Sequence, residues 1–336
     1  MKAIYLRPLS PFHLQTGSLD HESVESFPKA DTLSAAITFL WFREYRELYG
    51  FPDSIPFRIS SVMPAISIDS TYIRCYPKPI GLSIDPNKID HKVFKKIMYM
   101  TDSVFEKWRS GNLQLSDFPA NIKDPRLWAG NAIWSHKKFP GNEFKLFEQE
   151  TRTRVVLDRS TNESVPFHFV STIFDKNIRL FFLADIEPEQ EKGFMAMLRL
   201  LGDEGIGADR TVGMGQFEVE DVEDIHFDPF ENGELFNLGV FNPDSKETGA
   251  INWMASKYNL FNRYGWTSGK SLRRQTVTVI GEGAQLHCQE PLKGTVRKVL
   301  DPKDPKLIKS GIELDHAIYR DCRGFFLPLK SQKQKV

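Results

Sequence analysis

The chain has 336 residues, a length typical of about two domains. With 40% hydrophobic and 26% charged residues it has the composition of a globular protein, which excludes an intrinsically disordered chain. Its 44 basic and 44 acidic residues balance, which argues against a uniformly basic protein that coats nucleic acid but permits one basic face.

Three cysteines, Cys75, Cys288 and Cys322, lie far apart in the chain and form no C-x-x-C pair. We therefore expect neither a disulfide framework nor a zinc knuckle, and we expect a reducing, cytoplasmic compartment. The first residues lack the apolar stretch of a signal peptide, and the longest apolar run, residues 35–42, is too short to cross a membrane. The sequence predicts no membrane partner.

The first part of the chain predicts strands and helices in alternation. A strand over residues 2–12 precedes a helix from about 31 to 48, whose apolar residues recur at helical spacing behind Asp31, the expected N-cap. Strands interrupted by prolines fill residues 57–84. A second helical pattern lies within residues 91–109.

The elements that follow complete an α+β unit. Residues 85–150 are predicted to be an insertion, irregular after its helix. A buried strand over 178–186 leads into a helix that Pro188 opens and Gly202 ends, and a strand at 215–222 closes the unit. The resulting order, β-α-β-β-α-β, predicts a ferredoxin-like (RRM-like) domain.

The last third of the chain differs from the rest in its charge distribution and in its short predicted strands. Eight acidic residues within 218–234 suggest a domain seam, which we expect to face solvent or a basic partner. We place an N-terminal domain at residues 1–228 and a second, β-rich and degenerate ferredoxin-like domain at 229–336. Short strands are expected at about 275–280, 284–288, 294–299 and 316–329. From Pro291 to the end, eleven lysines and arginines outnumber five acids.

Four glycines in the segment 205–217 are the most informative local signal. Glycine permits positive φ and close backbone approach, so this loop could form a concavity of N–H groups for an anion, with Arg210 adding positive charge. The alternative is a tight connection without a ligand. A dinucleotide fingerprint is excluded because the loop follows a helix and enters a strand, and residues 265–271 are one residue short of a P-loop.

Read with other segments, this loop resembles the glycine-rich loop of the RAMP superfamily of CRISPR proteins, which are ferredoxin-like RNA-binding proteins. The supporting segments occur in the family's order across the chain. They are residues 26–36 with Asp31, Thr32 and Ser34, residues 153–159 with Thr161, residues 273–283, and residues 316–320 with Gly324.

Within that family the chain is most similar to the subunit that caps the 5′ end of the guide RNA in type III-A (Csm) interference complexes. The type III-B counterpart remains an alternative. The resemblance implies two ferredoxin-like domains and a projecting thumb, here residues 151–172. It also implies binding of the 5′ handle of the guide crRNA, with the large polymerase-like (cyclase) subunit and a backbone RAMP subunit as protein partners. It implies no catalysis, no cofactor and no metal.

Candidate RNA-binding residues combine positive charge with the glycine-rich loop, as single-stranded RNA requires. Thumb arginines could also form a plain solvated hairpin, and the start of the first helix could bind a phosphate or simply be capped. The candidates are Lys29, Ser34, Arg152, Arg154, Arg159, Gly205, Gly207, Asp209, Arg210, Gly213, Met214, Gly215, Arg273, Arg274 and Arg320.

A second functional class, a guide-RNA-processing endoribonuclease, needs a histidine as general acid or base. His13 and His21 precede the first helix, where such a residue could act, with Arg210 or Lys29 stabilising developing charge. No His–Tyr–Lys constellation is fixed by spacing, so we expect no enzyme. A third class, a pure protein scaffold, would not depend on these basic residues.

Overall fold

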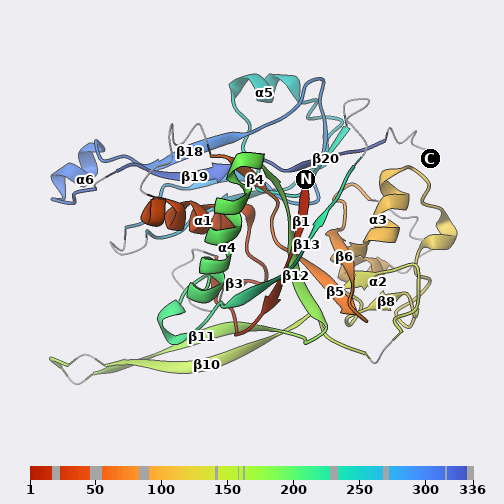
Figure 1. Cartoon of the computed structure of the whole chain (residues 1–336), viewed down its shortest axis with the longest axis horizontal. Helices are drawn as coiled ribbons and strands as arrows, with labels where there is room; N and C mark the ends of the chain where they lie inside the picture. Colours follow the sequence, from red (N-terminus) through yellow and green to blue (C-terminus); the bar gives the residue numbers. More distant parts are fainter. Residues whose placement is uncertain are drawn as a thin grey trace.

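The structure is a computed structural model and has a mixed α+β fold that is rich in sheet (Figure 1). It describes residues 1–16, 23–45, 55–82, 91–140, 143–157, 159–161, 163–227, 234–267, 272–314 and 316–330. A nine-stranded sheet forms its centre, with the strand order β13-β1-β12-β5-β6-β7-β9-β8 and with β4 paired to β12. Its strands are β1 (Lys2–Pro8), β4 (Phe57–Ile59), β5 (Met63–Ile68), β6 (Thr71–Pro77), β7 (Tyr99–Thr101), β8 (Leu127–Trp128), β9 (Ile133–Trp134), β12 (Ile178–Ile186) and β13 (Phe217–Asp224).

Four strands of this sheet and two helices follow the predicted β-α-β-β-α-β order. The strands are β1, β5, β12 and β13, and each neighbouring pair among them is antiparallel. Helices α1 (Ala30–Tyr45) and α4 (Glu191–Glu204), the latter entered through η2 (Pro188–Gln190), pack against each other and cover one face of the sheet. The alternation of side chains along β12 places Phe182 beneath these helices and Phe181 on the opposite face.

The helix that ends in the glycine-rich loop runs three residues further than predicted. Gly205 takes positive φ at its C-cap, whereas Gly202 lies inside the helix. A Cβ at Gly202 would collide with the carbonyl oxygen of Phe217, so this glycine allows α4 to lie close to β13.

The predicted single helix within residues 91–109 is wrong. The segment contains two helices, α2 (His91–Lys96) and α3 (Asp102–Arg109), separated by strand β7. Strand β7 pairs with β6 and β9, so sheet pairing interrupts the helical pattern. The insertion continues through η1 (Leu115–Asp117) and the short strands β8 and β9.

The C-terminal part is β-rich, as predicted, and its strands form small sheets: β17-β14-β20, β15-β16 and β18-β19. The predicted strand at 316–329 is divided into two around Gly324. A ferredoxin-like arrangement of this part and a boundary at residue 228 stay predictions, since residues 228–233 lie outside the described ranges. The elements are β14 (Glu234–Asn237), α5 (Ser245–Ala250), β15 (Leu260–Arg263), β16 (Val277–Ile280), β17 (Gln285–His287), β18 (Thr295–Leu300), α6 (Pro305–Lys309), β19 (Ile318–Cys322) and β20 (Phe326–Pro328).

Two hairpins extend beyond the body on the same side in Figure 1. One consists of β10 (Phe147–Leu157) and β11 (Ser164–Phe174), which are paired along their full length and enclose the predicted thumb. The other consists of β18 and β19 and carries α6 near its tip. Short strands β2 (Leu14–Gln15) and β3 (Val24–Glu25) form a small ribbon before α1.

The acidic segment is not a seam over its first seven residues, because residues 218–224 belong to β13, the edge strand of the central sheet. Four of its carboxylates are paired within the chain rather than free for a basic partner. Glu218 pairs with Arg7, Glu220 with Arg179, Glu223 with Arg74, and Asp224 with Lys2. Charges that are distant in sequence therefore cancel on the surface of the central sheet, between β13 and its neighbour β1 and between β13 and the more distant strands β12 and β6.

No helix in the described part of the chain is long and apolar enough to cross a membrane. All three cysteines are buried and free.

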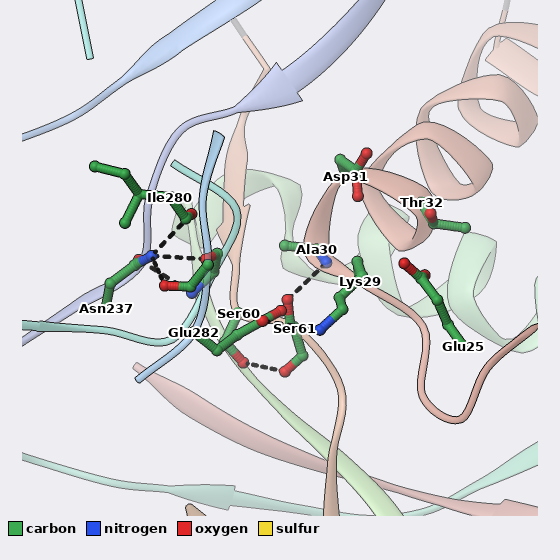
Figure 2. A network of polar contacts seen from close by, with 12 residues as sticks. Glu25, Lys29, Ala30, Asp31, Thr32, Ser60, Ser61, Asn237, Ile280 and Glu282 are labelled. Atoms are coloured by element: carbon green, nitrogen blue, oxygen red, sulfur yellow. Dashed lines mark hydrogen bonds and ion pairs between the residues drawn. The ribbon is translucent and has the colours of Figure 1, made fainter. Parts of the chain in front are cut away.

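A buried carboxylate joins the start of α1 to the C-terminal part. The expected N-cap role of Asp31 is wrong: its oxygens accept hydrogen bonds from Arg263 of β15, at 2.9 and 3.0 Å, and from Arg320 of β19. The first helical N–H, that of Ala30, instead donates to Ser61 Oγ at 3.0 Å (Figure 2). The residue that would have capped the helix therefore anchors two strands.

We expect Asp31→Asn to lower the free energy of unfolding by about 3–5 kcal/mol, because it leaves two buried guanidinium groups without their shared carboxylate. Denaturant unfolding measures the change. Glu148→Gln, which removes one partner of an exposed ion pair with Lys145, is the matched control and should have little effect.

The same substitution has a pH signature. Burial by itself would raise the pKa of Asp31, but Arg263 and Arg320 outweigh it and lower this pKa to about 2, from an ordinary 3.8. The stabilisation is therefore complete above about pH 4 and is lost as the pH falls towards 2. The unmodified chain should lose more stability over this interval than Asp31→Asn does; equal losses would contradict the assignment.

Candidate nucleic-acid interface

The glycine-rich loop is folded tightly onto itself. Gly205, Gly207, Gly213 and Gly215 all have positive φ. A Cβ at Gly205 would collide with the carbonyl oxygen of Met214, one at Gly207 with that of His13, and one at Gly215 with that of Ile206. Three of the four glycines are thus required for close backbone contacts as well as for their conformation.

Much of the loop's backbone hydrogen bonding is internal. The N–H groups of Ile206, Ala208, Gly213 and Gly215 donate to backbone carbonyl oxygens at 2.9–3.0 Å, and that of Met214 at 3.3 Å. These N–H groups are therefore not available to form the predicted anion concavity. Arg210 opens the 3₁₀ turn η3 (Arg210–Val212) and is partly exposed, as is Met214. The RNA-binding roles of these loop residues stay predictions.

The β10–β11 hairpin is attached to this loop near its middle, through Arg154, which lies opposite Phe167 on β11. Its guanidinium forms an ion pair with Asp209, which has a φ of 59°, and lies 3.9 Å from the centre of the Phe169 ring. Phe169 stacks in turn on His13, with ring centres 4.1 Å apart. Two predicted RNA-binding residues, Arg154 and Asp209, are thus joined by an ion pair. The aromatic stack that holds Arg154 in place was not visible in the sequence.

On either side of Arg154 the hairpin exposes both cations and apolar side chains. Arg152 pairs with Glu150 at 2.9 Å, and Arg159 lies near the turn and is exposed. Val155, Val156, Leu157 and Val165 are also exposed, at 52–68%. A surface of this kind can contact both the backbone and the bases of a single strand.

The two candidates at the start of α1 face the C-terminal part of the chain. Lys29 Nζ donates to Glu282 Oε2 at 2.8 Å, and Figure 2 shows the two side chains pointing toward each other. Ser34 Oγ donates to Asp321 Oδ2 at 2.8 Å. Because both polar groups have partners within the chain, the predicted phosphate contact at this helix start has no support from the geometry and stays a prediction.

The last three candidates lie around the Asp31 junction. Arg320 is buried and donates to Asp31 and to the carbonyl oxygen of Tyr264. Arg273 is exposed, and its guanidinium carbon lies 5.9 Å from the centre of the Tyr264 ring. Arg274 is half-buried, and electrostatic interactions connect it to Arg320, Asp31 and Arg263. Two groups of candidates therefore emerge, one around Arg154 of the hairpin and one at the Asp31 junction.

Residues absent from the sequence-based candidates complete both groups. Arg263, Glu25 and Glu282 form ion pairs at the junction, and the ring of Phe169 packs against Arg154 in the hairpin. No local motif marks them, because each acts through contacts more than a hundred residues away in the chain.

The geometry does not favour His13 as a general acid or base. It is fully buried beneath Phe169, and its Nδ1 lies 2.6 Å from the carbonyl oxygen of Val170. His21 lies outside the described residues. No group of three or more histidine, cysteine, aspartate or glutamate side chains among residues the structure describes is placed to hold a metal.

Comparison with protein families gives one match over more than half of the chain. The RAMP superfamily model matches residues 36–218. Two curated relatives carry the name CRISPR system Cms protein Csm4. The protein from Thermococcus onnurineus is 31% identical over 132 residues, which are 39% of this chain and 42% of the relative. The protein from Methanocaldococcus jannaschii is 24% identical over 263 residues, 67% of each chain. The chain thus matches less than half the length of the first relative.

Solved structures share the fold over nearly the whole chain. A chain of the Csm3–Csm4 subcomplex of the type III-A CRISPR-Cas interference complex has a TM-score of 0.62 and 18% identity, with coverage of 98% of this chain and all of that one. A chain of the Csm1–Csm4 cassette in complex with AMPPNP has a TM-score of 0.54 and 21% identity, with coverage of 98% and 97%. At these identities the likeness establishes the fold.

A glycine series tests whether the loop is shaped by packing. Gly213→Ala should cost about 1–2 kcal/mol from its positive φ alone, and Gly215→Ala should cost more because its Cβ also collides with backbone. Gly249→Ala, in α5 with open space around it, should instead stabilise by about 0.4–1 kcal/mol. Thermal or denaturant unfolding measures the order; Gly215→Ala no worse than Gly213→Ala would contradict the packing account.

Arg154 should hold the hairpin to the loop. We expect Arg154→Ala to speed amide hydrogen exchange in the glycine-rich loop and in the part of the hairpin around Arg154, because it removes both the Asp209 ion pair and the stack on Phe169. Arg152→Ala, on the same strand but paired only with exposed Glu150, is the control. Equal exchange in the two variants would show that Arg154 does not perform this role.

Proposed function

The chain belongs to the RAMP superfamily, and from that premise we propose that it is a Csm4-like subunit of a type III CRISPR complex, of subtype III-A. In this role it binds the 5′ handle of the guide crRNA and performs no catalysis. It connects the large polymerase-like subunit to a backbone RAMP subunit.

One observation carries the assignment: the chain aligns along 98% of its length, and along the whole of the other chain, with a structure from the Csm3–Csm4 subcomplex. The shared name of both curated relatives supports the same identity. The similar solved structures come from complexes of Csm4 with Csm1 and with Csm3, which motivates the two protein partners.

The hairpin and the glycine-rich loop supply the chemistry for RNA. Positive charge attracts the phosphate backbone, and apolar side chains can contact splayed bases. Exposed Arg152 and Arg159 on the hairpin, with Arg210 in the adjoining loop, offer the charge, and the exposed Val155–Leu157 segment offers the apolar surface. We propose that this hairpin is the thumb that separates handle nucleotides from the spacer.

The charge distribution supports one RNA-facing surface. Four acids of β13 are paired with three arginines and a lysine of the central sheet, so these four carboxylates do not present free negative charge to RNA. A neutral chain can therefore bind RNA locally while other surfaces contact protein partners.

Binding of handle RNA and of a scrambled RNA of equal length, by the full chain with its partner subunits over a salt series, tests the proposal. We expect a preference for the handle. The Arg152→Ala, Arg159→Ala double variant should flatten the slope of log K against log salt by about 1.4, at about 0.7 per phosphate contact. Arg199→Ala, an exposed arginine on α4, is the matched control and should leave the slope unchanged.

Two outcomes would contradict the proposal. Equal affinity for handle and scrambled RNA would remove the handle-specific function. Cleavage of precursor RNA that disappears in His13→Ala would establish the endoribonuclease instead.

A further inference from the structure

The junction between α1 and the C-terminal strands holds one positive charge more than it holds negative charges. Its cations are Lys29, Arg263, Arg274 and Arg320, and its carboxylates are Glu25, Asp31 and Glu282. The adjacent Asp321 is matched by Arg323, at 2.9 Å, and so does not alter this balance.

Three of the four cations have partners within the junction. Lys29 pairs with Glu282, Arg263 pairs with Glu25 and Asp31, and Arg320 pairs with Asp31. Both oxygens of Asp31 are occupied by these two arginines.

Arg274 is the cation that remains. Its backbone N–H donates to the carbonyl oxygen of Gly265 at 2.9 Å, which fixes its position beside Arg320. Its buried Nε has no hydrogen-bond partner in the described ranges, which omit residues 268–271 nearby, and the same holds for the buried Nε of Arg320. Each of these two neighbouring guanidinium groups thus has a buried Nε without an acceptor in the described ranges.

A guanidinium in this position is electrostatically unfavourable. Burial lowers the pKa of Arg274, and the charge of Arg320 lowers it further; Asp31 opposes this shift, and Arg263 adds a smaller lowering effect. An arginine nevertheless stays charged in proteins. Arg274 is half-buried, and its buried Nε has no acceptor in the described ranges, so an anion from outside the chain would supply the partner that this partly desolvated charge lacks.

The surroundings indicate what kind of anion. Phosphate oxygens match the planar fork of a guanidinium, which favours a phosphate group. Arg273 lies over the Tyr264 ring at the rim, and Trp266 beside it is 39% exposed. A cation next to one exposed and one partly exposed aromatic ring is typical of a surface for nucleotides rather than for a simple inorganic ion.

We propose that Arg274 is the seat of one phosphodiester group of bound single-stranded RNA, and that this phosphate completes the charge balance of the junction. The proposal rests on the RNA-binding function inferred above and deepens it. Because the junction joins α1 to strands β15 and β19, RNA bound here should stabilise the attachment of the C-terminal part to α1.

The test compares Arg274→Gln with Arg199→Gln, the exposed arginine on α4, in the full chain. Without any anion, Arg274→Gln should unfold at the same or a higher temperature, since it removes an unpaired buried charge. With handle RNA over a salt series, it should flatten the slope of log K against log salt by about 0.7, as expected for one lost phosphate contact. Arg199→Gln should change neither.

Inorganic phosphate separates this site from the RNA-binding function. Millimolar phosphate should raise the melting temperature of the unmodified chain and of Arg199→Gln but not that of Arg274→Gln. If no RNA binds to any of the proteins but this phosphate effect is seen, the anion site stands and the RNA function falls. If RNA binds with the same slope to Arg274→Gln as to the unmodified chain, the site proposal is overturned and the function stands.

Arg274→Lys keeps the charge and gives a second measure. It should retain most of the salt slope with weaker affinity, because an ammonium lacks the bidentate geometry of a guanidinium. A melting temperature of Arg274→Gln well below that of Arg199→Gln in the absence of anions would show that Arg274 already has a partner within the chain, and would overturn the proposal.

Discussion

One buried carboxylate, Asp31, determines how the C-terminal part of the chain is attached to the first helix. It lies in the first turn of α1, and its two oxygens serve Arg263 and Arg320, which come from two different small sheets. A buried carboxylate is tolerable only with such compensation, and each arginine likewise needs the carboxylate. The position of α1 is thereby tied to β15 and β19, and with it the positions of Lys29, Ser34 and Arg274.

A second linkage, made of stacked planar groups, positions the projecting hairpin. His13, Phe169 and Arg154 stack in sequence, and Arg154 reaches Asp209 in the glycine-rich loop. Segments that lie before α1, in β10 and β11, and after α4 meet at this point. The hairpin is therefore attached to the domain near its middle, and its end beyond Arg154 is exposed.

Neutral net charge has a specific structural meaning in this protein. On the central sheet, four acids of β13 pair with arginines and a lysine of strands β1, β12 and β6, and the charges cancel. At the junction the cancellation is one carboxylate short. Local imbalance, rather than total charge, is therefore what marks a surface for an anionic ligand.

Sequence patterns predicted the α+β class, the β-α-β-β-α-β order, and the position of strand β12 and of most of helices α1 and α4, because hydrophobic periodicity and helix-end residues are local signals. It also identified the hairpin and the glycine-rich loop as features to be explained. It was wrong about the single helix at 91–109, where Tyr99–Thr101 pairs with other strands.

Only the tertiary structure decided how the charged residues are used. Asp31 has the residue type and position of a helix cap, yet two arginines more than two hundred residues away bind it. Gly207 and Gly215 belong to a glycine-rich segment typical of an anion-binding loop. They are glycines, however, because a Cβ at either position would collide with a neighbouring carbonyl oxygen. Periodicity reports which face of an element is buried, but the partner of a buried charge depends on which distant segments the fold brings within hydrogen-bonding distance.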